Sequence, residues 1–331
     1  MTKRLSDLVE DKDRINIKED SFFFKQEEKN PFSLNGKKRV NLLALGDVGS
    51  TVLMGLRLMG ENQVESIGIW DINPKVCARF EMEINQIDQP IEHGSLPKVE
   101  IISTEELFNC HMMIFCASRG VPPVGQEGED VRMAQLKSNV ELVEYYAAMA
   151  KKEDFKGIFA IVSDPVDPLC KAAYLQGLAP QQVEGYGLGV MNSRALYFAR
   201  KEDKFGSFLA EGRAFGPHGE DLVIANSIEE YDHKLSLELT KLAIESNLKT
   251  RQLGFKPYIA PALSSGAISL LATLSGEWHY SSTYMGKDDI GAFLGVKNRR
   301  TPHGIEVEDL PLPEKLFNRI KGAYDNLAKI I

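Results

Sequence analysis

Apolar runs that read as strands alternate with helical patterns, and this alternation constrains the fold more than any other feature of the chain. The strand-like runs occur at 39–45, 65–71, 99–102, 112–116 and 157–163. Helical spacing of apolar residues occurs at 48–60, 74–86 and 132–150. Strands without polar alternation are typical of sheets covered on both faces. The sequence therefore predicts an α/β fold with a Rossmann-type, doubly wound parallel sheet.

The rest of the chain divides around this region. Residues 1–38 are rich in Lys, Asp and Glu and form a charged N-terminal arm, which either packs on a neighbouring subunit or is a partly disordered tail. Residues 39–186 are the predicted Rossmann domain, and residues 187–331 a second, α+β domain. In the second domain we expect helices near 192–202, 233–252, 261–274 and 313–330, and strands near 207–213, 278–285 and 290–297.

Composition excludes several classes of function. The 331 residues carry a net charge of −8 without a basic stripe, which argues against a nucleic-acid-binding body. The four cysteines form no CxxC pair, and we expect Cys116 and Cys170 to be small buried hydrophobes. The N-terminus has no apolar signal region and no segment has the length of a membrane span. We expect a cytoplasmic protein that binds neither nucleic acid nor membrane.

The turn after the first strand of the Rossmann region indicates a dinucleotide site. It reads Ala44-Leu45-Gly46-Asp47-Val48-Gly49, a G-x-G-x-x-G pattern with its first glycine replaced by alanine. Gly46 would let the backbone approach a pyrophosphate at the helix N-terminus, and Gly49 would let the helix pack closely on the sheet. Asp71 ends the second strand, where an acid that binds ribose belongs and would favour NAD over NADP. Alternatively, these residues are a helix N-terminus and a strand-end Asp that caps the next turn.

Three other residues are candidates for chemistry. His218 stands in the Gly/Pro loop FGPHGED, which can project an imidazole into a cleft. Arg194 lies early in a helix, and Arg132 follows the Gly-rich loop 117–131. The alternative for each arginine is an ordinary surface charge.

Taken in order, these motifs resemble the lactate/malate dehydrogenase family. The matching elements run from about residue 39 to the C-terminus: ALGDVG, Asp71, the loop and helix from Arg132 to Asn139, SDPVD, NSR, GPHGE and YIAP. The resemblance implies NAD-dependent hydride transfer at C2 of a small 2-oxo or 2-hydroxy carboxylate. It also implies a homo-oligomer, either a dimer or a tetramer, and no metal site.

The resemblance assigns roles to individual residues. His218 would be the proton donor and acceptor, Arg194 would bind the substrate carboxylate with two parallel hydrogen bonds, and Arg132 would polarise the carbonyl from a closing lid. The second domain would then be the substrate and catalytic domain. The cofactor-binding residues would be Gly46, Asp47, Val48, Gly49, Asp71, Ala117, Arg119, Asn139 and Ser163.

Four departures from the family pattern bear on the chemistry. Asp164 stands where the family has the Asn of SNPVD, and Met191 stands where the acid that partners the catalytic histidine belongs. We expect Asn192, the next residue, to substitute partly for that acid. The lid between Arg119 and Arg132 is longer than in lactate enzymes. Its specificity position falls at Gln126 or Glu127, where no arginine is present.

Asp164 leaves three hypotheses open. The first is an active dehydrogenase with altered substrate specificity, in which Asp164 pairs with His218 as a fourth catalytic residue. The second is an NAD-dependent enzyme that acts on the C–N bond of a 2-amino or 2-imino acid, with Asp164 binding the amine. The third is a regulatory homologue that binds NAD without turnover. A simpler alternative is that Asp164 caps the helix that starts at Pro165.

Overall fold

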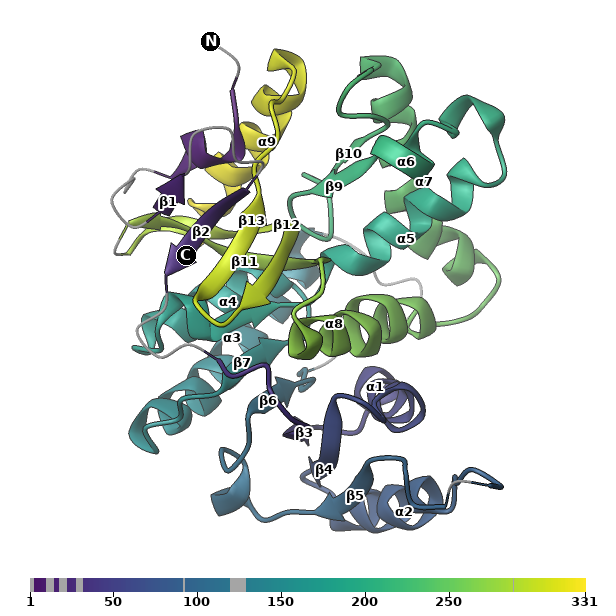
Figure 1. The fold of residues 1–331 in the computed structure, drawn as a ribbon, viewed down its shortest axis with the longest axis vertical. Helices are drawn as coiled ribbons and strands as arrows, with labels where there is room; N and C mark the ends of the chain where they lie inside the picture. The colour runs from purple at the N-terminus through teal and green to yellow at the C-terminus, as the bar shows by residue number, and fades with distance from the viewer. Residues whose placement is uncertain are drawn as a thin grey trace.

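The computed structural model describes residues 3–9, 15–17, 23–27, 32–91, 93–119, 129–287 and 289–331. At residues 15–17, 24, 27, 129–135 and 287 the description covers the backbone only. The described strands form an eleven-stranded sheet, in the order β1-β2-β13-β12-β11-β8-β7-β6-β3-β4-β5, and a separate two-stranded sheet, β10-β9. Helices pack along the large sheet, as Figure 1 shows.

Six neighbouring strands of the large sheet are parallel. They are β3 (Lys38–Leu43), β4 (Val64–Trp70), β5 (Lys98–Ile101), β6 (Met112–Phe115), β7 (Ile158–Ile161) and β8 (Val183–Gly185). The chain starts in the middle at β3, runs outward through β4 and β5, and returns to the other side of β3 for β6, β7 and β8. This order is that of a Rossmann fold, so the predicted fold class is confirmed.

Helices cover both faces of the parallel strands. One face carries α1 (Asp47–Met59), α2 (Pro74–Asn85), a π-helix (Pro261–Ile268) and α8 (Ser269–Ser275). The other face carries α3 (Glu129–Lys152) and α4 (Val166–Leu175). Burial on both faces explains why the strands β3, β6 and β7 contain unbroken apolar runs. Both cysteines are free thiols: Cys170 is buried in one core, as expected, and Cys116 is partly buried against the other.

The C-terminal half extends the sheet with antiparallel strands. These are β11 (His279–Lys287), β12 (Ile290–Thr301) and β13 (Gly304–Glu308), with α9 (Glu314–Leu327) packed near β12. Beside them lie the short strands β9 (Arg213–Phe215) and β10 (Val223–Ala225) and the helices α5 (Leu188–Ala199), α6 (Phe208–Glu211) and α7 (His233–Gln252). The predicted domain boundary near residue 187 stays a prediction, because the sheet continues from β8 into β11.

One predicted strand is wrong. Residues 208–211 form the short helix α6, and the strand β9 begins only at Arg213. Leu209, Ala210 and Glu211 are good helix formers, and this local preference overrides the apolar pattern on which the strand prediction was based. The short strands β8, β10 and β13 were not predicted.

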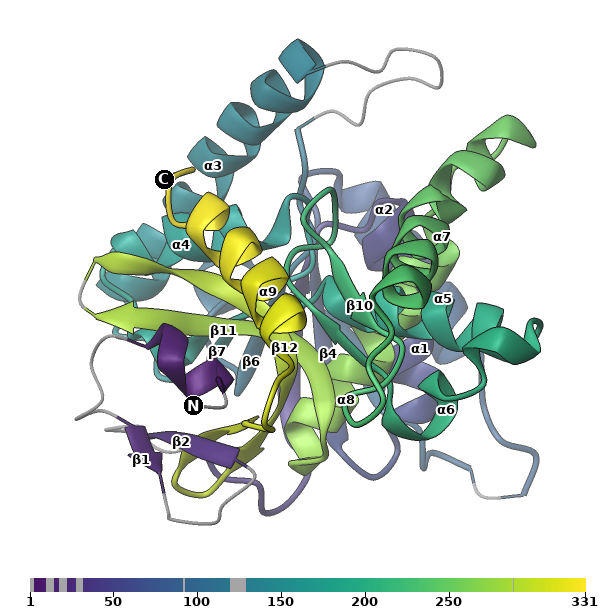
Figure 2. The same ribbon diagram turned by 90° about the horizontal axis from the view of Figure 1, so that it is seen from above.

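The described parts of the N-terminal arm pack on their own chain. Leu5, Leu8 and Val9 are buried in the core beneath α9, and β2 (Phe23–Glu27) pairs with β13 along its whole length. β1 (Ile15–Ile17) then pairs with β2. Figures 1 and 2 show these purple N-terminal strands beside the yellow C-terminal ones. The described residues of the arm are therefore not a disordered tail, whereas contact with a neighbouring subunit stays a prediction.

A buried polar cluster fastens the parallel strands to the antiparallel ones. Glu184 on β8 is fully buried and accepts hydrogen bonds from Ser281 Oγ (2.7 Å), His279 Nε2 (3.1 Å) and Arg300 Nε (3.3 Å). Burial opposes ionisation of this carboxyl, but the hydrogen bond from His279 and the charge of Arg300 bring its pKa down to about 2. Glu184 is therefore a buried anion that depends on its partners.

Among the helices that the structure describes, none combines the length and apolar character needed to cross a membrane.

We expect Glu184→Gln to lower the free energy of unfolding by about 3–5 kcal/mol, because it leaves the guanidinium of Arg300 buried without its counter-charge. Urea unfolding monitored by circular dichroism measures the change. The matched control is Glu202→Gln, which disrupts an exposed pair with Lys204 and should cost less than about 1 kcal/mol. Equal effects of the two variants would contradict the role assigned to Glu184.

Candidate active site

Three strand ends meet at one edge of the parallel sheet. The turn 44–49 follows β3, the segment 116–119 follows β6, and Ser163 and Asp164 follow β7. β3 and β6 are neighbours in the sheet although the chain leaves them in opposite directions. In open α/β sheets, ligands bind outside the carboxyl ends of the strands at such a switch point.

The turn after β3 contains two glycines, and the structure explains the need for glycine at only one of them. A Cβ at Gly49 would lie 1.9 Å from the carbonyl oxygen of Ala44, so the close approach of helix and turn requires glycine there. A Cβ at Gly46 would meet nothing within 4 Å, and its φ of −70° suits any residue. Neither packing nor backbone conformation explains glycine at 46, whereas a ligand lying against this backbone would. Ala44 itself has a φ of 75°, a conformation that favours the glycine found in the usual motif.

Asp71 accepts hydrogen bonds from the backbone and can still accept more from a ligand. Its Oδ2 accepts the Leu45 N–H at 2.8 Å, and its Oδ1 accepts the Asn73 N–H at 2.9 Å. The side chain thus caps the turn, as one of the two interpretations of the sequence expected. A carboxylate has about four lone-pair sites, so this partly exposed group can still accept two ribose hydroxyls.

Asn139 and Ser163 join the ends of β6 and β7. Asn139 on α3 is fully buried, donates from Nδ2 to the Asp164 carbonyl at 2.8 Å and accepts the Arg119 N–H at 2.8 Å. Ser163 donates from Oγ to the Ala117 carbonyl at 2.6 Å. The Arg119 side chain is exposed and pairs with Glu141 at 3.5 Å. Any influence of Asn139 on a cofactor therefore passes through the two strand ends that it joins.

His218 lies in the loop that connects β9 and β10. The Gly216 N–H donates to the Gly295 carbonyl of β12 at 2.9 Å and fixes this loop against the sheet. After β8, a Cβ on Gly187 would lie 3.1 Å from the His218 Cβ, so glycine at this position gives the histidine room for its close approach. The imidazole consequently lies beside the carboxyl ends of β7 and β8.

His218 faces Asp164. The distance from Nδ1 to the carboxylate Oδ1 is 3.7 Å, and the side chains are 12% and 61% exposed. His218 Nε2 is buried without a partner among the described residues. Burial lowers the pKa of His218, the Asp164 charge opposes this shift, and the Arg194 charge adds to it. The imidazole is therefore held mainly in its neutral form at neutral pH.

Asp164 does not cap the following helix. Pro165 is the N-cap residue of α4, and no side chain caps this helix N-terminus. The peptide bond between Asp164 and Pro165 is cis. The capping alternative is wrong, and the carboxylate is turned toward His218 instead.

Arg194 is a buried guanidinium, 9% exposed, on α5. Desolvation lowers its pKa to about 10, against the opposing influence of the Asp164 charge. Met191, one turn earlier, is buried with its sulfur 3.3 Å from Arg194 Nη1. Within the described part of the chain, no hydrogen bond joins Asn192 to His218, so the amide does not take the place of the lost acid.

The structure does not describe the side chains of several predicted site residues. The backbone of Arg132 belongs to α3, but its side chain is not described. The lid positions Gln126 and Glu127 are also outside the described residues.

Two further charged residues at this edge were not predicted. Lys256 follows α7 and places its Nζ 2.9 Å from the Asp47 carboxylate at the start of α1. Asp167 on α4 is buried and accepts a 2.6 Å hydrogen bond from Ser282, and burial raises its pKa to about 7. Both contacts join residues more than 100 positions apart, so no local pattern could indicate them.

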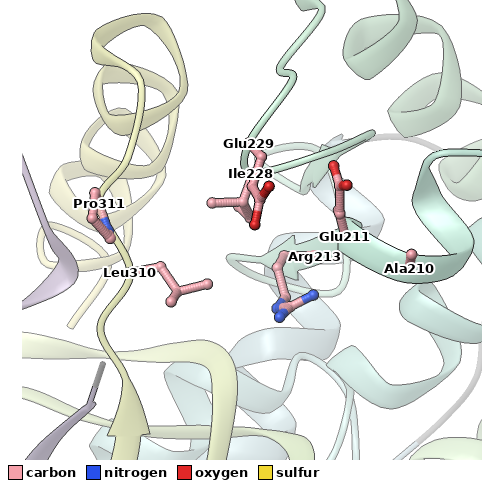
Figure 3. A pocket seen from close by; sticks show the side chains of 7 residues that line it. All are labelled: Ala210, Glu211, Arg213, Ile228, Glu229, Leu310 and Pro311. Atoms are coloured by element: carbon pink, nitrogen blue, oxygen red, sulfur yellow. The ribbon is translucent and has the colours of Figure 1, made fainter. Parts of the chain in front are cut away.

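A cavity of about 400 Å³ lies away from this edge, between α6, β9 and the segment after β13 (Figure 3). Its arginine, Arg213, is held by two hydrogen bonds to Glu308 and therefore has little left to offer a ligand. In the described residues, no three His, Cys, Asp or Glu side chains gather as metal ligands would.

No protein-family profile matches the sequence. Curated relatives include the L-lactate dehydrogenase of Mesomycoplasma hyopneumoniae, 26% identical over 193 residues, which are 57% of this chain and 58% of that protein. The L-lactate dehydrogenase of Mycoplasma mobile is 25% identical over 206 residues, 62% of each chain. The chain thus spans about three fifths of the length of the curated relatives that it matches.

Solved structures share the fold over most of the chain. The minor L-lactate dehydrogenase of Enterococcus mundtii has a TM-score of 0.72 at 20% identity and covers 88% of this chain and 96% of its own. The malate dehydrogenase of Archaeoglobus fulgidus in complex with NADH has a TM-score of 0.71 at 17% identity, with 87% and 97% covered. At these identities the likeness is one of fold, and together with the curated relatives it confirms the resemblance predicted from the motifs.

The two glycines of the β3 turn should respond differently to alanine. We expect Gly46→Ala to keep the thermal stability of the protein but to weaken binding of NADH at least about tenfold, because the new methyl group would occupy the space expected for the pyrophosphate. Gly49→Ala should lower stability by several kcal/mol through its clash with the Ala44 carbonyl. Thermal unfolding and fluorescence titration with NADH measure these effects. Unchanged NADH affinity in Gly46→Ala would contradict the placement of the cofactor.

Proposed function

We propose that this protein, a divergent relative of the lactate and malate dehydrogenases, is an NAD-dependent oxidoreductase. It transfers a hydride between nicotinamide and C2 of a small 2-oxo or 2-hydroxy carboxylate, with a substrate specificity different from that for lactate or malate. The names of the relatives support the reaction class, and the changes at positions 164 and 191 support the altered specificity.

The main support for this proposal is the buried charge of Arg194. In the described part of the chain, no carboxylate lies within ion-pair distance of the guanidinium, although it is only 9% exposed. A buried cation without a counter-ion is costly, and an anionic ligand would remove that cost. Arg194 also lies near enough to His218 to lower its pKa. A carboxylate bound to Arg194 would therefore lie close to an acid–base group.

The residues of the chain divide the chemistry between them. Arg194 would bind and orient the substrate carboxylate. His218 would donate a proton to the C2 oxygen during reduction and remove it during oxidation. Asp164, which faces the imidazole, would stabilise the imidazolium, and Arg132 would polarise the carbonyl. NAD, when bound, supplies or accepts the hydride at C2.

The turn after β3 fits a dinucleotide. The open position at Gly46 and the N-terminus of α1 would hold the pyrophosphate, next to Asp47, Val48 and Gly49. Asp71 would accept from the ribose hydroxyls and repel a 2′-phosphate, which favours NAD over NADP. Ala117, Arg119, Asn139 and Ser163 would shape the nicotinamide side of the site.

A second candidate function follows from the exposure of Asp164. At 61% exposed and 3.7 Å from His218, its carboxylate is free to accept a hydrogen bond from a ligand. A site with a guanidinium and a carboxylate matches the carboxylate and ammonium of a 2-amino acid, or the iminium of a 2-imino acid. This arrangement supports chemistry at a C–N bond. A homologue that binds NAD without turnover is the third alternative, because Met191 leaves no acid behind His218.

One assay separates these functions. Purified protein with NADH is given a panel of 2-oxo acids with and without ammonium. Turnover without ammonium supports the dehydrogenase, turnover that requires ammonium supports C–N chemistry, and NADH binding without turnover leaves the regulatory homologue.

Asp164→Asn is the sharper test of the site. In a dehydrogenase, the loss of the charge beside His218 should lower kcat for 2-oxo acids about tenfold or more. In a C–N enzyme, the same change should abolish the ammonium-dependent reaction. Steady-state kinetics provides the measurement, and Asp154→Asn, an exposed residue paired with Lys156, is the matched control. Kinetics like the wild type's in Asp164→Asn would rule out both roles of the carboxylate.

The low pKa of His218 predicts a pH dependence. Reduction needs the protonated imidazole, so kcat/KM for a 2-oxo acid should fall as pH rises through a value below 6.5. Oxidation of the 2-hydroxy acid needs the neutral imidazole and should rise over the same range. Asp164→Asn should move both inflections to lower pH, because the Asp164 charge raises this pKa while burial and Arg194 lower it. An inflection above 7, or one that does not move, would contradict this account.

The oligomer and the cellular location are further parts of the proposal. We expect a homodimer or homotetramer in the cytoplasm. Exposed apolar side chains on α1, Met54, Leu58 and Met59, support an interface between subunits. Sedimentation velocity tests the oligomeric state.

A further inference from the structure

The back of the Arg194 guanidinium is held by two helices. On its own helix, α5, Met191 contacts Nη1 through sulfur at 3.3 Å. The neighbouring helix α7 provides the Ala243 carbonyl, which accepts from Nη1 at 3.3 Å, and Asn247 Oδ1, which accepts from Nη2. Ala243 and Asn247 are four residues apart and so lie on one face of α7. Helices α5 and α7 pack side by side in Figure 1.

These contacts leave one edge of the guanidinium available. Arginine has five N–H donors in a planar fork. Two acceptors lie at Nη1 and one at Nη2, within the described part of the chain. Nε–H and one N–H of Nη2 remain without an acceptor in the described part of the chain, and the Nε/Nη2 edge of a guanidinium carries two parallel donors. That edge matches the two oxygens of a carboxylate.

Asn247 is an unexpected residue for its position in the sequence. It lies inside the twenty-residue helix α7, where asparagine is a poor helix former. Its contact with Arg194 gives a reason for its presence. The amide is also neutral: it fixes the guanidinium without neutralising it, whereas a carboxylate at this position would compete with the substrate.

We propose that Asn247 is a positioning residue that anchors Arg194. By fixing the rotamer of Arg194, it presents the Nε/Nη2 edge to the carboxylate of the substrate and preserves the full positive charge. The inference rests on the proposed function, because it assigns the anion at Arg194 to a 2-oxo acid.

Two variants test this role. Asn247→Ala removes the acceptor and should raise KM for the 2-oxo acid about tenfold, with kcat changed less than about twofold and NADH affinity unchanged. Asn247→Asp keeps the acceptor and the size but adds a charge that neutralises Arg194. Its KM should exceed that of the wild type at neutral pH and return toward the wild-type value as the pH falls and the new carboxyl is protonated. A purely structural role would not give this pH dependence. Lys241→Ala, an exposed change on the same helix, is the matched control.

Binding of oxamate, an unreactive analogue of a 2-oxo acid, separates this inference from the proposed function. If the wild type does not turn over 2-oxo acids but binds oxamate more tightly than Asn247→Ala does, positioning by Asn247 is supported and the dehydrogenase is not. If the wild type turns over 2-oxo acids and Asn247→Ala has the same KM, the role of Asn247 is overturned. A rise in KM matched by an equal loss of NADH affinity also overturns it. Absence of both oxamate binding and turnover in the wild type overturns both proposals.

Discussion

The buried carboxylate of Glu184 fixes the junction on which the geometry of the candidate site depends. β8 and β11 are paired there through Gly185 and Ser282, and Glu184 adds Ser281, His279 and Arg300 from β11 and β12. Immediately after β8 the chain enters α5, which carries Arg194. The loop that carries His218 is fastened to β12 through Gly216 and Gly295. The relative position of the two functional groups is therefore set by a buried ionic cluster that contacts neither of them.

The candidate site departs from the family pattern that the sequence resembles in where negative charge is expected around the imidazole. Position 191 holds a thioether inside the core, and the partly exposed carboxylate of Asp164 faces the ring at 3.7 Å. An exposed carboxylate is screened by water and is available to ligands, whereas a buried one would serve the histidine alone. Together, the changes at positions 191 and 164 weaken the stabilisation of the imidazolium and add a group that can bind the substrate. Arg194 is correspondingly anchored by neutral acceptors.

Patterns that are local in sequence predicted most of the fold and the location of the site. The long apolar runs of β3, β6 and β7 and the glycine turn at 44–49 required only their own residues to be recognised. Strands of three to five residues, such as β8, β10 and β13, are too short to show a period. The strand expected at 207–213 is wrong because helix-forming residues between two glycines decide the local structure. Contacts such as Asn247 with Arg194 and Lys256 with Asp47 join residues 53 and 209 positions apart, and only the tertiary fold creates them.

The pairing of β2 with β13 has a consequence for the order in which the protein is made. Gln26 on β2 donates to the carbonyl of Tyr284, 258 residues later in the chain. During synthesis the parallel strands β3 to β8 can assemble while the ribosome is still translating the C-terminal half, since domains generally fold as units from the N-terminus. The arm has to wait until β13 has emerged. Its docking therefore follows the synthesis of β13 and covers an edge strand that would otherwise be available to another chain.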